Sequence, residues 1–213
     1  MSELSFETMR RAMVASQLRT NAVSDNRVIA AMAEVPRERF VPADRAAIAY
    51  ADIQVPLCAG RTLNPPMALG RMLTELQIRS TDRALVIGAA TGYSAAVLAR
   101  LAASVVALEE DEALVAQADF SSGARFVRGP LVEGWPDDAP YDAILIDGAV
   151  ETVPQAIVAQ LADGGRLAVA IVEAGVSRLS VGRRSGAGFG LAAFADADAA
   201  PLPGFAPPPA FKF

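Results

Sequence analysis

The run ALVIGAATGYSAAVLAR, residues 84 to 100, decides the fold. It opens with apolar residues, breaks into small residues from Gly88 to Gly92, and resumes with apolar residues at helical spacing. This order is typical of a buried strand, a tight turn and a helix. The open question is whether the turn holds a cofactor or only reverses the chain.

The same alternation continues along the chain. We expect helices at about 92–102, 111–117 and 153–162, and strands at about 83–87, 104–108, 124–128, 142–147 and 166–172. Strands that alternate with helices predict the α/β class with a doubly wound, mostly parallel sheet.

The segment before this core is predicted to be helical. Apolar spacing indicates a helix over Phe6–Thr20, a second from Ser24 or Asp25 through Met32 that Pro36 ends, a short one near Asp44–Tyr50 and another over Met67–Leu76. We therefore expect an N-terminal, substrate-side segment at residues 1–78 and a core at 79–213, together forming one compact domain.

The C-terminus, GFAPPPAFKF at residues 204–213, is expected to be extended. Two interpretations remain for it. Exposed phenylalanines at Phe205, Phe211 and Phe213 would favour docking of a partner, whereas buried ones would indicate a last strand packed on the sheet.

Composition excludes several function classes. The chain of 213 residues has a formal net charge of −5 and a pI of about 4.8, so nucleic acid is not expected as a partner. Cys58 is the only cysteine and there is no histidine, which argues against a disulfide, a thiolate metal site and histidine-based acid/base catalysis. The N-terminus shows no secretion signal and glycines interrupt the longest apolar run, so we expect a cytoplasmic protein that does not span a membrane.

The turn differs from a dinucleotide-binding fingerprint. That fingerprint would place glycine at 88, 90 and 93, whereas this chain has Gly88, Ala90 and Tyr93. The spacing of Gly88 and Gly92 instead fits a nucleoside with an amino-acid tail that crosses the turn. Glu109 ends the next strand, where its carboxylate could accept hydrogen bonds from both ribose hydroxyls. Together these features predict an adenosyl cofactor site.

Each feature also has a simpler interpretation. Glycine-broken turns between strand and helix are common, and a glutamate at a strand end is often solvated. In YDAILID, Asp142 starts the strand and is expected to be structural. Asp147 ends it, on the rim where ligands bind in such sheets, and is a candidate site residue.

The chain resembles the protein-L-isoaspartate O-methyltransferases over nearly its whole length. The similarity lies in an N-terminal block, 13–42, that contains VPRERFVP, in AYADIQVPL at 49–57, GRTLNPP at 60–66, the glycine turn, VVALEE at 105–110 and GWPDDAPYDAILID at 134–147. The resemblance implies a Rossmann-like methyltransferase fold, S-adenosylmethionine as methyl donor, S-adenosylhomocysteine as product, and isoaspartyl peptides or proteins as substrate for repair.

The resemblance also suggests which residues form the site. Thr62 and Asn64 would orient the acceptor carboxylate. The cofactor would lie on the turn and the two strand ends, at Gly88, Ala89, Ala90, Thr91, Gly92, Glu109 and Asp147. An isoaspartyl carboxylate is ionised at neutral pH, so methyl transfer to it needs no protein base and suits a chain without histidine.

Several positions depart from the family pattern. Asn64 stands where the family has serine, Ala90 where it commonly has glycine, Val86 where it has an acidic residue, and Pro130 where an aspartate meets the adenine. Asp147 adds a negative charge where an anionic substrate would arrive. Three hypotheses follow: an isoaspartyl-repair methyltransferase, a methyltransferase for a neutral or cationic acceptor, and a non-catalytic descendant that binds a protein partner.

Overall fold

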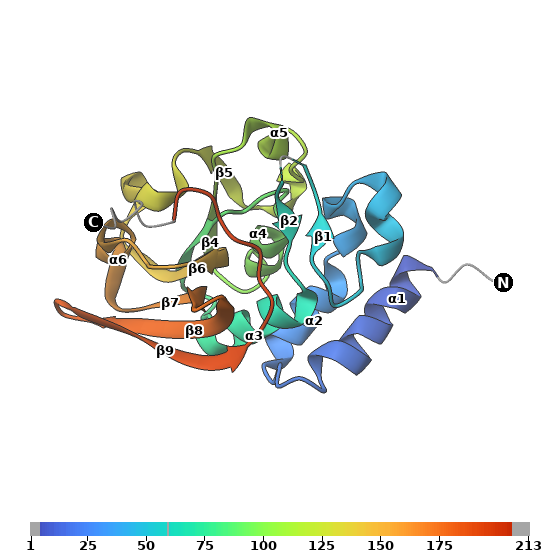
Figure 1. Cartoon of the computed structure of the whole chain (residues 1–213), viewed down its shortest axis with the longest axis horizontal. Helices are drawn as coiled ribbons and strands as arrows, with labels where there is room; N and C mark the ends of the chain where they lie inside the picture. The colour runs from blue at the N-terminus through green and yellow to red at the C-terminus, as the bar shows by residue number, and fades with distance from the viewer. Residues whose placement is uncertain (1–4, 59, 206–213) are drawn as a thin grey trace.

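The structure is a computed structural model, and it describes residues 5–58 and 60–205. It contains the predicted α/β core, with an N-terminal helical segment on one side of it (Figure 1). The helices are α1 (Phe6–Met13), α2 (Asn26–Glu34), α3 (Pro66–Leu76), α4 (Tyr93–Leu98), α5 (Glu112–Val115) and α6 (Gln155–Ala159). The strands are β1 (Val55–Pro56), β2 (Thr62–Leu63), β3 (Arg83–Ile87), β4 (Ser104–Glu109), β5 (Arg125–Arg128), β6 (Tyr141–Val150), β7 (Leu161–Glu173), β8 (Val176–Ser185) and β9 (Gly188–Asp196).

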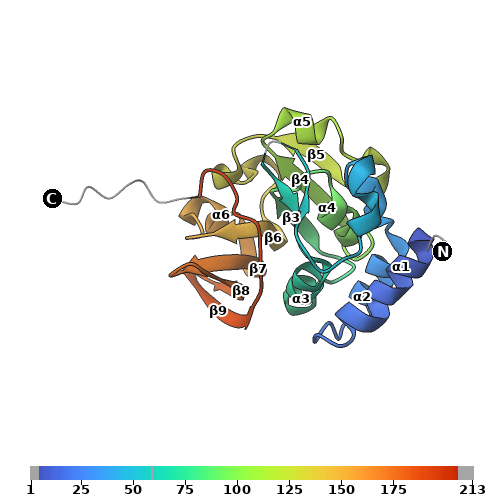
Figure 2. The ribbon, with the colours of Figure 1, turned by 45° about the vertical axis from the view of Figure 1, so that its right-hand side comes forward.

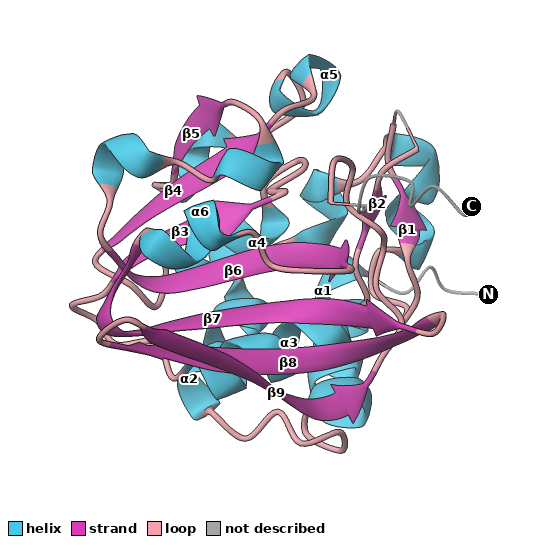
Figure 3. Ribbon diagram, turned by 60° about the vertical axis from the view of Figure 1, so that its left-hand side comes forward, coloured by secondary structure: helices cyan, strands magenta, loops and turns pink. Residues whose placement is uncertain are grey.

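The main sheet has the order β5-β4-β3-β6-β7-β8-β9. The five strands from β5 to β7 are parallel, and β8 and β9 extend the sheet as an antiparallel edge. Figure 3 shows this order across the sheet, with α6 in front of it and α3 behind. Because β4 and β5 lie on one side of β3 and the later strands lie on the other, the order in which strands are added to the sheet reverses at β3. In sheets of this kind, ligands bind at that point, outside the carboxyl ends of the strands.

Each central strand supplies both faces of the sheet with apolar side chains. In β3, Ala84 and Val86 belong to the core beneath α1 to α4, whereas Leu85 and Ile87 belong to the core on the other face. This alternation explains why the strand is an unbroken apolar run in the sequence. Figure 2 shows the helices α1 to α4 on one side of the sheet.

The local sequence sets the helix ends. The Asp25 carboxylate accepts a hydrogen bond from the backbone N–H of Arg27 at 2.8 Å and caps α2, which ends before Pro36 as expected. Pro66 occupies the first turn of α3, where its missing N–H is not needed, and Gln77 closes that helix in the left-handed conformation.

The five strand predictions are confirmed, and so are the helices that became α2 and α3, whereas the three helices of the core are shorter than expected. The helix expected to reach residue 162 ends at Ala159, and Leu161 instead begins β7 beside Tyr141. The first helix gives way to a π-helical stretch at Val14–Leu18, and the short helix near Asp44 is a 3-10 turn.

The chain does not end at β9. It returns across the carboxyl ends of the parallel strands, in red in Figure 1, as far as Phe205, which is 4% exposed and packs in the second core. Phe205 is therefore buried rather than available for docking. Phe211 and Phe213 lie outside the described residues.

Candidate functional site

Three predicted site positions meet at one edge of the sheet. Gly88 follows β3, Glu109 ends β4 and Asp147 lies near the end of β6, and these are the three strands around the reversal of strand order. The glycine turn is tight: Gly88 has a φ of 77°, Ala90 of 50° and Gly92 of 100°. Both Gly88 and Ala89 donate their backbone N–H groups to the Leu108 carbonyl at 3.0 Å, which joins the turn to β4.

Glu109 is fully buried, and its carboxylate accepts five hydrogen bonds. The backbone N–H groups of Ala90, Glu110 and Asp111 donate to it at 2.7, 3.0 and 3.1 Å. The Arg61 guanidinium donates the other two, at 2.8 and 3.1 Å, as a bidentate ion pair. A carboxylate offers about four lone-pair sites, so in this conformation Glu109 has no capacity left for another donor.

Thr91 is also committed to the fold. Its side-chain hydroxyl is buried and donates to the backbone carbonyl of Phe40 at 2.6 Å. That bond ties the glycine turn to the end of the VPRERFVP block, which forms a 3-10 turn at Arg37–Phe40. Gly92 is needed for space as well as for its φ, because an added Cβ would lie 2.6 Å from the ring of Phe126.

The acceptor-side candidates lie on the segment that follows β1. The Thr62 hydroxyl is half-buried and donates to the side-chain oxygen of Gln54 at 3.1 Å. Asn64 is buried, and its side-chain amide donates to the backbone carbonyl and carboxyl of Asp147 at 3.0 and 2.8 Å. The Asn64 side-chain oxygen accepts from the backbone N–H of Ala200 at 2.9 Å.

Arg37 holds this segment in place. The side chain is fully buried, and its guanidinium donates to the backbone carbonyls of Ala49 and Asn64 at 2.6 and 2.5 Å. It also lies over the Tyr93 ring, 4.6 Å from the ring centroid. Sequence reasoning gave Arg37 no role, although its block carries the family resemblance. The burial of Arg37, which only the structure shows, is what indicates that its guanidinium binds main-chain carbonyls.

Asp147 is buried, and polar and charged side chains of the same chain surround its carboxyl group. Burial raises the pKa of its carboxyl above the ordinary value of 3.8. Nearby Ser94 and Asn64 and the positive charges of Arg37 and Arg61 oppose that rise. Asp142, at the other end of β6, accepts the backbone N–H of Arg83 at 2.9 Å and therefore links the starts of β6 and β3, as a structural residue would.

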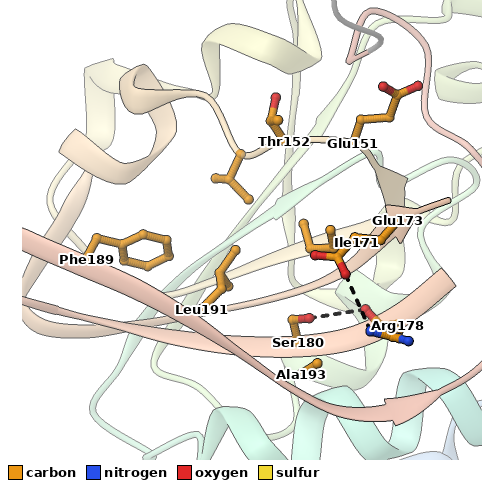
Figure 4. Close-up of a pocket in the computed structure, with 10 residues that line it drawn as sticks. Glu151, Thr152, Ile171, Glu173, Arg178, Ser180, Phe189, Leu191 and Ala193 are labelled. Carbon is orange, nitrogen blue, oxygen red and sulfur yellow. Dashed lines mark hydrogen bonds and ion pairs between the residues drawn. The ribbon is translucent and has the colours of Figure 1, made fainter. Parts of the chain in front are cut away.

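A separate concavity lies beside the ends of β6 and β7 (Figure 4). Its volume is about 400 Å³, and its apolar part includes Ile171, Phe189 and Leu191. Glu173 and Arg178 form an ion pair at 3.4 Å on its wall. None of the predicted site residues lines it, so it is distinct from the edge that Gly88, Glu109 and Asp147 share.

Comparison with known proteins identifies the family. The family model of protein-L-isoaspartate(D-aspartate) O-methyltransferase matches residues 9–189. The chain belongs to this family. It is 42% identical over 164 residues to the protein-L-isoaspartate O-methyltransferase of Methanoculleus marisnigri, covering 74% of each chain. It is 41% identical over 170 residues to that of Methylorubrum populi, covering 78% of this chain and 80% of the relative.

Solved structures show the same fold. A protein-L-isoaspartate O-methyltransferase superposes with a TM-score of 0.78 at 24% identity, over 92% of this chain and 66% of the other. A second neighbour, a putative protein-L-isoaspartate O-methyltransferase from Plasmodium falciparum in complex with S-adenosylhomocysteine, gives a TM-score of 0.75 at 19% identity, over 90% of this chain and 96% of the other. The Rossmann-like methyltransferase fold is therefore confirmed. Members of this family use S-adenosylmethionine as the methyl donor.

The turn and Glu109 do not accommodate that donor in the conformation observed. The Glu109 carboxylate is saturated, and Leu202 covers the turn, because a Cβ added at Gly88 would lie 2.8 Å from a Leu202 methyl carbon. Sequence reasoning missed both Arg61 and Leu202. Neither belongs to a periodic segment, and their partners lie far away along the chain.

None of the helices within residues 5–58 and 60–205 has the length and apolar character needed to cross a membrane.

Proposed function

We propose that this chain transfers the methyl group of S-adenosylmethionine to the carboxylate of isoaspartyl residues in peptides and proteins. Membership in the protein-L-isoaspartate O-methyltransferase family, over residues 9–189, carries this proposal. The chemistry also suits the composition. The acceptor is already an anion at neutral pH, so the reaction needs alignment and exclusion of water rather than a histidine base, and the chain has no histidine.

On the acceptor side, we assign direct contact to Thr62 and a positioning role to Asn64. Thr62 is half-buried, and its hydroxyl can exchange Gln54 for a substrate oxygen. Asn64 has both amide hydrogens engaged with Asp147, so it holds the loop in place rather than presenting a donor. Arg37 also holds this loop, because its guanidinium donates a hydrogen bond to the backbone carbonyl of Asn64.

The experiment that tests this function is methyl transfer with purified protein. Labelled S-adenosylmethionine is supplied with an isoaspartyl peptide and, separately, with the same peptide containing ordinary aspartate. We expect incorporation into the isoaspartyl peptide alone, as a base-labile methyl ester. No incorporation above the aspartyl control would refute the proposal.

The same assay, extended to amines and phenols and combined with a titration of S-adenosylhomocysteine, separates the two other hypotheses. Incorporation into amines or phenols but not into the isoaspartyl peptide would indicate a different acceptor, which the negative charge of Asp147 would favour. A protein that neither methylates any acceptor nor binds S-adenosylhomocysteine would be a non-catalytic descendant. We call the edge of the sheet shared by Gly88, Glu109 and Asp147 the donor edge. Arg61 already occupies it through its ion pair with Glu109, and this observation favours the non-catalytic descendant.

A further inference from the structure

The donor edge is filled by two segments of the chain itself. The first is the loop that carries Arg61. The Arg61 guanidinium donates two of the five hydrogen bonds that Glu109 accepts, and it also donates to the Gly88 carbonyl at 3.4 Å. Arg61 is only 8% exposed. It therefore lies against both elements that sequence reasoning assigned to the adenosyl group, the turn and the strand-end carboxylate.

The second segment, which we call the return segment, is Ala199–Phe205. It is fastened to the end of β6, because the Ala149 N–H donates to the Ala200 carbonyl at 2.7 Å and the Leu202 N–H donates to the Ala149 carbonyl at 2.9 Å. These bonds place the Leu202 side chain between two glycines. A Cβ added at Gly148 would lie 2.5 Å from Leu202 Cγ, and one added at Gly88 would lie 2.8 Å from a Leu202 methyl carbon.

Asn64 connects the two segments. It lies three positions after Arg61, and its side-chain oxygen accepts the Ala200 N–H at 2.9 Å. The loop that carries Arg61 and the return segment that carries Leu202 are thus joined directly by a hydrogen bond. Movement of one would loosen the other.

We propose that Arg61 and Leu202 close the donor site, and that the methyl donor binds only after both side chains have been displaced. This inference rests on the proposed function. It adds a determinant of donor affinity that lies outside the glycine turn and Glu109, in two side chains, Arg61 and Leu202, with no other assigned role.

The surroundings allow the displacement without leaving the buried Glu109 carboxylate short of hydrogen-bond donors. When Arg61 leaves, Glu109 keeps the three backbone N–H donors of Ala90, Glu110 and Asp111. Its two freed positions match the two hydroxyl donors of a ribose. Such an exchange of donors costs far less free energy than leaving a buried carboxylate without partners, which would cost several kcal/mol.

There is also space outside the site for the displaced Arg61 side chain. A solvent-facing concavity of about 370 Å³ lies directly outside the site, and Arg61 and Leu202 are part of its lining. Glu110 and Asp111 line the same concavity, so a displaced guanidinium would meet two carboxylates. Pro201 and Pro203 flank Leu202 there and limit the conformations that the return segment can adopt.

The test is a calorimetric titration of the full chain with S-adenosylhomocysteine. Arg61→Gln shortens the side chain and removes its charge, and Leu202→Ala removes the side chain that covers Gly88. We expect each variant to bind at least tenfold more tightly than the unmodified protein, equivalent to about 1.4 kcal/mol, and the double variant to bind more tightly still. Arg45→Gln and Leu191→Ala alter an exposed arginine and a partly exposed leucine away from this edge and should leave the affinity unchanged.

The outcomes separate the closure from the proposed function. Tight binding by the unmodified protein, with no gain or a loss in both variants, would overturn the closure and leave methyl transfer intact. No binding by any folded variant at millimolar ligand would overturn the closure and the proposed function together. Circular dichroism establishes folding, and because Arg61→Gln leaves the return segment whole, it tests the closure even where Leu202→Ala does not fold.

Discussion

The side-chain amide of Asn64 donates both of its hydrogens to Asp147, to the backbone carbonyl at 3.0 Å and to the carboxyl Oδ1 at 2.8 Å. The two residues are 83 positions apart, one in the loop after β2 and the other near the end of β6. This pair joins the acceptor side of the site to the donor edge. It also leaves Asp147 as a carboxyl group that is buried among hydrogen-bond donors.

The first prediction concerns the pH dependence of stability at Asp147. An aspartate whose pKa rises on folding stabilises the protein fully below its unfolded pKa, and this contribution disappears as the pH rises through the folded pKa. Burial raises the pKa of Asp147 above 3.8, so Asp147→Asn, which stays neutral and still accepts from Asn64, should avoid that loss. We expect its stability advantage over the unmodified protein to grow from pH 4 upward, measured by urea unfolding at successive pH values.

The control for this experiment is Asp44→Asn. The Asp44 side chain is 73% exposed, so this variant measures the background effect of removing one surface carboxylate. An advantage of Asp147→Asn that shrinks as the pH rises would show that Asp147 is held as an ion in the folded protein.

A second prediction concerns Thr62 and depends on the proposed function. Thr62→Val keeps the shape of the side chain and removes the hydroxyl. A hydrogen bond to a charged group contributes about 1.5 to 3 kcal/mol, so kcat/KM for an isoaspartyl peptide should fall by roughly 10- to 150-fold. The affinity for S-adenosylhomocysteine should not change. Thr152→Val alters an exposed threonine as the matched control, and an unchanged kcat/KM for Thr62→Val would remove Thr62 from the site.

A third prediction concerns the strained turn. Ala90 has a φ of 50°, a left-handed conformation that costs a residue with a Cβ roughly 1 to 2 kcal/mol. Glycine adopts it without that cost but loses more entropy on folding, so Ala90→Gly should give a net gain of about 0.5 to 1 kcal/mol. For a chain of this size the Tm should rise by roughly 2 to 4 °C per kcal/mol.

Ala95→Gly is the matched control for the turn. Ala95 lies in the interior of α4, where glycine lacks both the helical preference and the buried methyl group, so the Tm should fall. If Ala90→Gly also lowered the Tm, the turn would be held by packing of the Ala90 methyl group rather than strained by it.

The sheet could be predicted from the sequence because buried parallel strands are short apolar runs between turn residues. That pattern located β3 and β6, and it put Glu109 and Asp147 at the ends of strands, where a parallel sheet brings them to one edge. The pattern could not supply their partners. Arg61 reaches Glu109 from 48 residues away, and its loop has no periodicity from which a contact could be inferred.

The C-terminal part was predicted less well for a related reason. β8 and β9 form an edge hairpin in which small, charged and apolar residues are mixed and most side chains are at least partly exposed, so neither face shows a strong apolar alternation. The return segment has no regular structure at all, and its position depends on backbone bonds to Ala149 that the side chains do not encode. A contact of this kind decides whether the donor edge is open, and it is visible only in three dimensions.

A fourth prediction concerns Arg166, which binds together three parts of the core. The side chain is 5% exposed and donates to the carbonyls of Leu76 and Gln77 at the end of α3, each at 3.0 Å, and to the Asp82 carboxylate at 2.5 Å. Arg166→Met keeps most of the apolar stem but leaves Asp82 buried without its cation. Breaking a buried pair in this way should lower the free energy of unfolding by about 3 to 5 kcal/mol, measured by urea denaturation.

Two further variants distinguish the buried pair from the loss of an arginine as such. Arg178→Met removes a side chain that is 47% exposed and pairs with Glu173 at 3.4 Å, so it should cost less than about 1 kcal/mol. Adding Asp82→Asn to Arg166→Met should restore part of the lost stability, because the stranded charge is then gone. If the double variant were no more stable than Arg166→Met alone, the main-chain carbonyls that Arg166 binds, those of Leu76, Gln77 and Asp142, would account for its effect rather than the Asp82 charge.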